Sequence, residues 1–262
     1  CGPCNTVNQS IAVKFTQLGC NVAMLDRNVE RTQRFADQLM DAREINERYG
    51  RAISVQADLS KLHHVQDAVS RSAEAFGGID IYIDGIMTNE PKPFSDPNAL
   101  EDIDRLIDVN LRAPLMMTHA VMRFLQGRKR GRIIYLMHDI IRLGVPGNAL
   151  LAMTRTGLSS FARTLAREIG DTGVTANCVA MGITEEYLMG QGKIMDATPA
   201  PQGGVQKSSM QEWQRQLLSI HPQANMVETD RIANLVAFLA SPLGAGVTGQ
   251  TIAASQGMSL LS

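Results

Sequence analysis

The sequence lacks the features that mark membrane and secreted proteins. No apolar run reaches the roughly 18 residues that a membrane span needs, and the N-terminus has no basic region followed by an apolar run. Only 4 Cys occur in 262 residues, without a regular framework, which argues against a disulfide-stapled fold and for free thiols. We therefore expect a cytoplasmic protein that does not contact a membrane.

An excess of charge of one sign is also missing. The chain has 25 Lys plus Arg against 26 Asp plus Glu, a formal net charge of −1, so no overall field favours nucleic acid. The basic run Arg128, Lys129, Arg130 and Arg132 is short and is interpreted as a surface turn. His63 and His64 have no Cys or carboxylate cluster at ligand spacing, so we expect no metal site.

Short apolar segments alternate with longer stretches of helical period. The segments with strand character are 21–25, 52–57, 79–83, 132–137 and 174–179, and each of the first four is followed by a helical stretch. Alternation of this kind requires right-handed crossovers and a parallel sheet covered on both faces. The sequence therefore predicts one α/β domain over residues 1–262, with a doubly wound parallel sheet in three α/β/α layers.

Two segments interrupt this alternation. Residues 182–227 form a long stretch rich in Gly, Pro, Gln and Ser in its middle, which predicts either a lid over a binding site or an irregular excursion. The second interruption is at the start, where a helix over 9–18 follows almost at once with no strand before it. A doubly wound sheet needs a strand there, so we expect further residues upstream of Cys1.

Motifs spread along the chain carry a resemblance to a known family. Gly2 opens a turn into a helix, and Asp26 ends the next strand 24 positions later. QADLS, DVNL, GRIIYLMHDIIRLGVPGNALLAMTRTGL, ANCVAMG and VTGQTIAASQG follow in that order. Over nearly its whole length the chain resembles the short-chain dehydrogenase/reductase family, which implies a Rossmann-like fold and an oxidoreductase ancestry.

The resemblance also implies a dinucleotide site and its contacts. Asp26 would accept hydrogen bonds from the adenosine ribose, which favours NAD(H), although Arg27 could pair with a 2′-phosphate if Asp26 turned away. Asp58 matches the residue that faces the adenine ring. The full set of implied cofactor contacts is Gly2, Thr6, Val7, Asp26, Arg27, Asp58, Leu59, Gly182 and Thr184.

The glycine-rich positions of the family are largely replaced. Where the family has TGxxxGxG this chain reads CGPCNTVN, so Thr6 and Asn8 occupy positions of glycines that let a pyrophosphate approach the backbone. The family's NNAG becomes DGIM, which places the bulky Ile86 and Met87 beside the cofactor. We expect dinucleotide binding to be weakened or lost.

The catalytic positions differ as well. The family's Tyr, its Lys four residues later and its Ser thirteen residues earlier correspond to Leu151, Arg155 and His138. Leu151 has no proton to give, and the Arg155 guanidinium stays charged near neutrality, so neither replaces a general acid. His138 could exchange a proton or be an ordinary loop residue. Asn110 matches the family's active-site Asn, or it satisfies a neighbouring backbone group.

The segment CGPC at residues 1–4 copies the dithiol motif of thioredoxins. The chain is far longer than that fold, and the resemblance downstream assigns these residues to a different loop. We interpret the match as coincidence, although the two thiols could still oxidise because they lie near a helix start.

Two functions remain open from the sequence. The first is a pseudoenzyme that binds a small ligand or a partner subunit, which explains the joint replacement of Tyr, Lys, Ser and two glycines. The second is a diverged NAD(H)-dependent oxidoreductase acting on a carbonyl or alcohol, with His138 or Tyr187 as proton donor.

Association into a homodimer or homotetramer is a further expectation. The family pairs the helices equivalent to 104–126 and 149–169 across a two-fold axis, and both segments carry apolar faces here. Residues expected to be partly buried in such an interface are Leu115, Met122, Leu158, Phe161 and Leu165.

Overall fold

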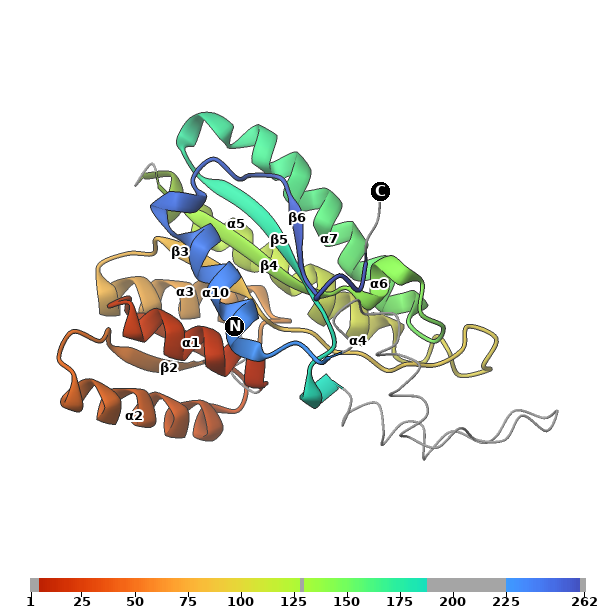
Figure 1. Cartoon of the computed structure of the whole chain (residues 1–262), viewed down its shortest axis with the longest axis horizontal. Coiled ribbons are helices and arrows are strands. Elements are labelled where there is room, and N and C mark those ends of the chain that lie inside the picture. Colours follow the sequence, from red (N-terminus) through yellow and green to blue (C-terminus); the bar gives the residue numbers. More distant parts are fainter. Residues whose placement is uncertain (1–4, 128–129, 188–224, 260–262) are drawn as a thin grey trace.

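A computed structural model describes residues 5–127, 130–187 and 225–259, in which strands and helices alternate (Figure 1). The strands are β1 (Val22–Asp26), β2 (Ala52–Gln56), β3 (Ile81–Asp84), β4 (Arg132–His138), β5 (Thr175–Met181) and β6 (Thr251–Ala254). The helices are α1 (Thr6–Gln17), α2 (Val29–Ile45), α3 (Leu62–Phe76), α4 (Ile103–Ile107), α5 (Ala113–Gly127), α6 (Ile140–Leu143), α7 (Ala149–Glu168) and α10 (Thr229–Ala240). Short 3₁₀ turns occupy η2 (Gly170–Thr172) and η3 (Pro242–Gly244), and a π turn occupies η1 (Asp108–Arg112).

Helix ends follow local capping chemistry. The Asn5 side chain accepts a hydrogen bond from the Asn8 amide over 2.7 Å and so begins α1, and Asn28 caps α2 in the same way through Arg31. Gly77 ends α3 with a φ of +74°, a conformation that other residues adopt only with strain. Residues next to each helix thus determine where α1 and α2 begin and where α3 ends.

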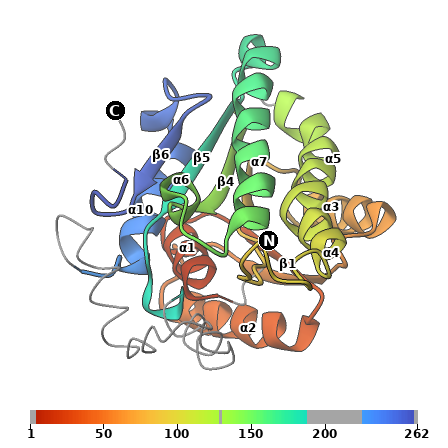
Figure 2. The same ribbon diagram turned by 90° about the vertical axis from the view of Figure 1, so that its right-hand side faces the viewer.

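Every strand pairing is parallel, and helices cover both faces of the strands. β1 pairs with β2, while β3, β4, β5 and β6 form a second ladder in that order. Helices α3, α5 and α7 pack on one face, and α1, α2 and α10 pack on the other (Figure 2). Side chains of β4 alternate between the two layers, with Ile133 and Tyr135 in one and Ile134 and Leu136 in the other. The predicted Rossmann-like α/β/α architecture is confirmed.

The strands that the structure describes form two separate ladders. Within the described residues, β1 has a strand neighbour only in β2, and β3 only in β4, so the two ladders do not join. This gap is where a strand leading into α1 was expected.

The helix expected over 104–126 contains the π turn η1 at Asn110 and continues as α5. One expectation about its neighbourhood is wrong. Leu158 and Leu165 are 0% and 7% exposed because they face the chain's own sheet, so they belong to its core and not to a subunit interface. Leu115, Met122 and Phe161 are partly buried against the same core.

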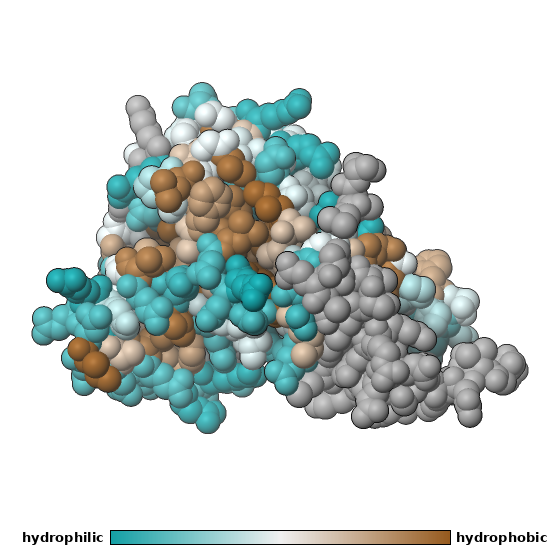
Figure 3. All heavy atoms as spheres, in the orientation of Figure 1, coloured by the Kyte–Doolittle hydropathy of each residue, from teal (hydrophilic) through white to brown (hydrophobic). Residues whose placement is uncertain are grey.

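Apolar surface also occurs away from these helices. Figure 3 shows hydrophobic surface gathered over α10 and the strands beside it, whereas α2 is mainly hydrophilic. Phe238 and Leu243, at the end of α10 and in η3, are 41% and 83% exposed. Among the described helices, none is long and apolar enough to cross a membrane. Most of the predicted lid over 182–227 lies outside the described residues.

Candidate functional site

The candidate site lies at the carboxyl ends of the parallel strands, where open α/β sheets bind ligands. Asp26 ends β1, Asp84 ends β3 and His138 ends β4, while Gly182 and Thr184 follow β5. The N-terminus of α1 lies at the same edge, because Asn8 contacts Gly85 just after β3. The fold thus gathers the implied cofactor residues that lie in the described part of the chain at one edge; Gly2 lies outside it.

The acidic residues implied in adenosine recognition are held by local hydrogen bonds. The Asp26 carboxylate accepts a bond from the Asn28 amide over 2.8 Å, at the start of α2 beside Arg27. The Asp58 carboxylate accepts bonds from the Ser60 amide and hydroxyl at 3.0 and 2.7 Å, and the hydroxyl contributes most to lowering the pKa of Asp58. Leu59 is buried beneath this turn. Local hydrogen bonds thus fix the orientation of both carboxylates.

A carboxylate of this chain occupies the N-terminus of α1. One Glu186 oxygen accepts bonds from the Thr6 amide and the Thr6 hydroxyl, both over 2.7 Å. The first amides of a helix bind anions because they have no partner within the helix and stand at the positive end of its dipole. Glu186 therefore stands where the family resemblance places a pyrophosphate. Val7, in the same turn, is buried in the core.

Asn8 closes the space beside this helix turn. Its amide nitrogen donates to the Gly85 carbonyl over 2.9 Å, and a Cβ placed on Gly85 would come within 2.0 Å of the Asn8 amide oxygen. A side chain at position 85 would therefore have to displace the Asn8 amide group. Ile86 and Met87 follow and pack against the core. The side chains that replace small family residues fill this part of the site.

Arg155 forms a buried ion pair beneath the site. Its guanidinium donates to the Asp84 carboxylate over 2.6 Å and also to the Ile86 carbonyl. The Arg155 and Asp84 side chains are 0% and 2% exposed, so the charges compensate each other away from water. Leu151, one turn earlier on α7, is fully buried among apolar side chains. Two of the three family catalytic positions are thus occupied by core residues.

His138 and Tyr187 meet at the remaining catalytic position. Their ring centroids are 4.7 Å apart. Burial, and secondarily the positive charge of Arg155, lowers the pKa of His138 to about 4, and burial raises the pKa of Tyr187 well above its usual range. Both groups are therefore neutral near pH 7. Asp139 points elsewhere, since it accepts a bond from the Ser259 hydroxyl over 2.5 Å and pairs with Arg142.

Asn110 has a structural role in this arrangement. Its side-chain oxygen accepts from the Thr88 amide over 2.9 Å, and its nitrogen donates to the Thr88 carbonyl over 2.8 Å. The side chain is fully buried in the π turn η1. Both polar atoms of Asn110 therefore fix the loop after β3, which is the local alternative left open by the sequence.

The segment after β5 is closely packed. A Cβ on Gly182 would lie 2.7 Å from the Ser255 backbone. Any residue larger than glycine would therefore clash at position 182. The buried Thr184 hydroxyl accepts a bond from the Tyr187 amide over 3.3 Å, which starts the turn that carries Glu186 toward α1. Asp84 and Glu186 are the two residues that the sequence reasoning missed. Asp84 could have been found from the sequence, because an acidic residue that ends an apolar strand needs a buried partner. No local pattern indicates the contact of Glu186 with Thr6.

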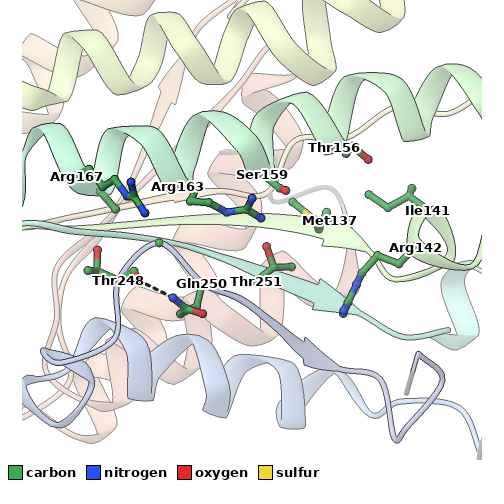
Figure 4. A pocket seen from close by; sticks show the side chains of 12 residues that line it. Met137, Ile141, Arg142, Thr156, Ser159, Arg163, Arg167, Thr248, Gln250 and Thr251 are labelled. Carbon is green, nitrogen blue, oxygen red and sulfur yellow. Dashed lines mark hydrogen bonds between the residues drawn. The ribbon is translucent and has the colours of Figure 1, made fainter. Parts of the chain in front are cut away.

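A separate hollow of about 510 Å³ lies between α7 and the chain leading into β6. Figure 4 shows Arg163 and Arg167 on α7 facing Thr248 and Gln250 across it. Asp26, Asp84 and His138 do not line this hollow, so it is distinct from the candidate site. In the described residues no group of His, Cys, Asp or Glu is arranged to hold a metal ion, and the described cysteines, Cys20 and Cys178, are free.

A parallel sheet covered by helices on both faces, with carboxylates at the ends of β1 and β3 and a helix N-terminus at the same edge, defines a Rossmann-like α/β protein. A family model described as enoyl-(acyl carrier protein) reductase matches residues 5–259. The chain belongs to the short-chain dehydrogenase/reductase family, a family of oxidoreductases.

Individual relatives agree with this assignment. The chain is 26% identical to hydroxynaphthalene reductase of Aspergillus fumigatus over 244 residues. This alignment covers 93% of this chain and 85% of that protein. It is 26% identical over 257 residues to 3-oxoacyl-(acyl-carrier-protein) reductase of Staphylococcus epidermidis, with 98% and 96% covered. A crystal structure of a dehydrogenase/reductase from Sinorhizobium meliloti superposes with a TM-score of 0.80 at 27% identity, covering 98% of this chain and 92% of that one.

Proposed function

We propose that this chain is a member of the family that binds a small ligand or a partner subunit and does not transfer hydride. The observation that carries the proposal is the buried pair of Arg155 and Asp84. The Arg155 guanidinium is engaged with the Asp84 carboxylate and the Ile86 carbonyl away from water, so it does not offer the proton relay that the family's Lys provides. Leu151, at the family's general-acid position, is fully buried and has no proton to donate to a carbonyl.

The N-terminus of α1 supports the same proposal. A dinucleotide pyrophosphate would have to displace Glu186 from Thr6, and Asn8 would have to leave Gly85 for the backbone to come as close as a glycine permits. Both rearrangements oppose binding, and the negative charge of Glu186 adds repulsion. A neutral or cationic small ligand meets neither obstacle.

A second function, a diverged NAD(H)-dependent oxidoreductase, is favoured by one observation. His138 and Tyr187 stand ring to ring at the position of the family's carbonyl-polarising group. The Tyr187 hydroxyl keeps its proton at neutral pH and so is the better donor of the two, while His138 would orient it. The raised pKa also makes the Tyr187 hydroxyl a weaker acid than an ordinary tyrosine. Because a weaker acid protonates a carbonyl less readily, we rank this function second.

The two functions are separated by binding and turnover. The purified chain is titrated with NADH and with NADPH, followed by nucleotide fluorescence, and then assayed against a panel of ketones, aldehydes and alcohols. The Staphylococcus epidermidis relative serves as the active control. We expect weak or undetectable binding and background turnover. Turnover that is lost in Tyr187→Phe would establish the oxidoreductase instead, and tight binding without turnover would indicate a binder gated by the cofactor.

A further inference from the structure

The hollow between α7 and the chain leading into β6 is lined mainly by side chains that can donate hydrogen bonds. Its volume of about 510 Å³ lies within the range of about 300–1,000 Å³ that small-molecule sites occupy. The described residues that line it include three arginines, four hydroxyl side chains and one amide, and no acidic residue. The arginines are Arg142, Arg163 and Arg167. This set of groups favours an anionic ligand.

Arg163 and Arg167 carry the charge at one end of the hollow. They lie one turn apart on α7 and face the hollow together (Figure 4). In the part of the chain that the structure describes, neither guanidinium forms an ion pair or a hydrogen bond. Two like charges at this spacing on a helix repel each other. An anion held between them would remove that repulsion and would use the fork of N–H donors that each guanidinium presents.

The wall opposite these arginines comes from the chain leading into β6. Gly249 brings this chain close to α7, since a Cβ on Gly249 would lie 3.4 Å from the Ala166 Cβ. The Thr248 hydroxyl accepts a hydrogen bond from the Ala176 amide over 3.2 Å and keeps its own proton to donate. The Gln250 side-chain nitrogen donates to the Thr248 carbonyl over 3.1 Å and has a second N–H. Neutral donors held in place thus face the two arginines.

The other end of the hollow combines apolar surface with the third arginine. Met137 and Ile141 are buried side chains that line this end, and Arg142 lies beside them (Figure 4). Arg142 pairs with the buried Asp139 carboxylate over 3.3 Å through one of its nitrogens, so its charge is already compensated. A ligand that matches both ends has its anionic group beside α7 and a carbon body that reaches Met137 and Ile141.

We propose that this hollow binds a phosphate monoester of a small organic molecule, with the phosphate between Arg163 and Arg167. Such a phosphate carries about −1.5 to −2 charges at neutral pH and has three acceptor oxygens, so it suits two guanidinium groups and the neutral donors opposite them better than a single carboxylate does. The hollow is larger than a phosphate group alone requires, which leaves room for the organic part. The site is separate from Asp26, Asp84 and His138, so this inference does not depend on the proposed function.

The test measures binding by isothermal titration calorimetry at low salt. The probes are phenyl phosphate and glycerol 3-phosphate, compared with phenol, glycerol and inorganic phosphate. We expect both esters to bind more tightly than their parent alcohols and than inorganic phosphate, and their affinity to fall as salt is added. The double substitution Arg163→Gln with Arg167→Gln should weaken ester binding by about tenfold or more. Its Tm should stay close to that of the unchanged chain, because both side chains are exposed.

The matched control is Arg34→Gln with Arg48→Gln. It removes the same charge from exposed positions on and just after α2, which covers the other face of the sheet. Ester affinity in this control should stay within about twofold of the unchanged chain, because exposed charges so far from the hollow are screened.

Several outcomes would overturn the proposal. Esters that bind no more tightly than phenol and glycerol would show that the hollow takes no phosphate. Inorganic phosphate that binds as tightly as the esters would show a site for the free anion only. An equal loss in the two double variants would assign binding to the overall charge. Ester binding that survives Arg163→Gln with Arg167→Gln and increases in Glu186→Gln would place the phosphate at the N-terminus of α1 instead.

Discussion

The Arg155 guanidinium donates a 2.6 Å hydrogen bond to the Asp84 carboxylate, and neither side chain is more than 2% exposed. This pair joins α7 to the end of β3 at the place where the family resemblance puts catalysis. A charge so deeply buried is tolerated only while its partner is present. Removing either partner alone should therefore destabilise the domain.

Breaking the pair from one side should destabilise the protein strongly. Arg155→Met leaves the Asp84 carboxylate buried without a partner, and we expect a loss of about 3–5 kcal/mol in the free energy of unfolding, measured by urea denaturation. The control is Arg71→Met in the exposed pair with Asp67, which should cost less than about 1 kcal/mol. The double variant Arg155→Met with Asp84→Leu should recover much of the loss; a double variant no better than Arg155→Met would argue against a compensated pair.

Removing the Glu186 carboxylate should open the N-terminus of α1. Glu186→Gln removes the negative charge beside Thr6, so we expect NADH affinity to rise several-fold at low salt and the gain to shrink as salt is added. The matched control is Glu185→Gln, an exposed neighbour that should change the affinity little. If the two substitutions changed the NADH affinity equally, the effect would come from the overall charge of the protein and not from the contact of Glu186 with α1.

The nucleotide that does bind should lack a 2′-phosphate. Asp26 stands at the end of β1 with its carboxylate fixed by the Asn28 amide, in a position to accept from a ribose hydroxyl and to repel a phosphate. We expect a lower Kd for NADH than for NADPH, and Asp26→Ser should narrow or reverse the difference. A tighter Kd for NADPH in the unchanged protein would show that Arg27 sets the preference.

His138 should make stability depend on pH. Its pKa is about 4 in the folded chain against an ordinary value near 6.5, so the unfolded chain binds the proton more readily. The free energy of unfolding should therefore fall as pH drops from about 6.5 to 4 and level off below that range, by up to roughly 3 kcal/mol. His138→Asn should flatten that part of the profile. If His138→Asn left the pH dependence of the free energy of unfolding unchanged, the loss of stability in acid would be due to carboxylates.

Restoring the family's catalytic groups tests what the scaffold has kept. Leu151→Tyr with Arg155→Lys and His138→Ser supplies a proton donor, an ammonium and a hydroxyl at the matching positions. A positioned general acid and a carbonyl-polarising donor each contribute roughly 10²-fold or more, so activity should appear only in the triple variant. Circular dichroism checks that it folds. Turnover by the unchanged chain that survives both His138→Ala and Tyr187→Phe would place catalysis elsewhere.

Association remains a prediction of the family resemblance. Leu115, Met122 and Phe161 are partly buried and available to an interface between helices, and Phe238 and Leu243 expose further apolar surface. We expect a dimer or tetramer in light scattering. A 28.5 kDa particle throughout the micromolar range would contradict this.

Much of the fold was predictable because it depends on local periodicity. The segments predicted as strands overlap β1 to β5. Val65, Ala68 and Val69, at the i, i+3, i+4 spacing of an amphipathic helix, form the buried face of α3. The role of Asn110 was foreseen only as one of two alternatives, because the sequence could not show that Thr88 would present both its N–H and its C=O to one amide.

The hydrophobic periodicity of the sequence does not show which residues far apart in the chain will contact each other. Arg155 and Asp84 are 71 positions apart, and Thr6 and Glu186 are 180 apart. Leu158 and Leu165 show the same limit, since an apolar helical stripe states that a face is buried but not whether a sheet or a second subunit buries it. The order of the residues is therefore sufficient to predict the helices and strands and their alternation. The pairing of Arg155 with Asp84 and the contact of Glu186 with the start of α1 arise only when the packed layers bring remote segments together.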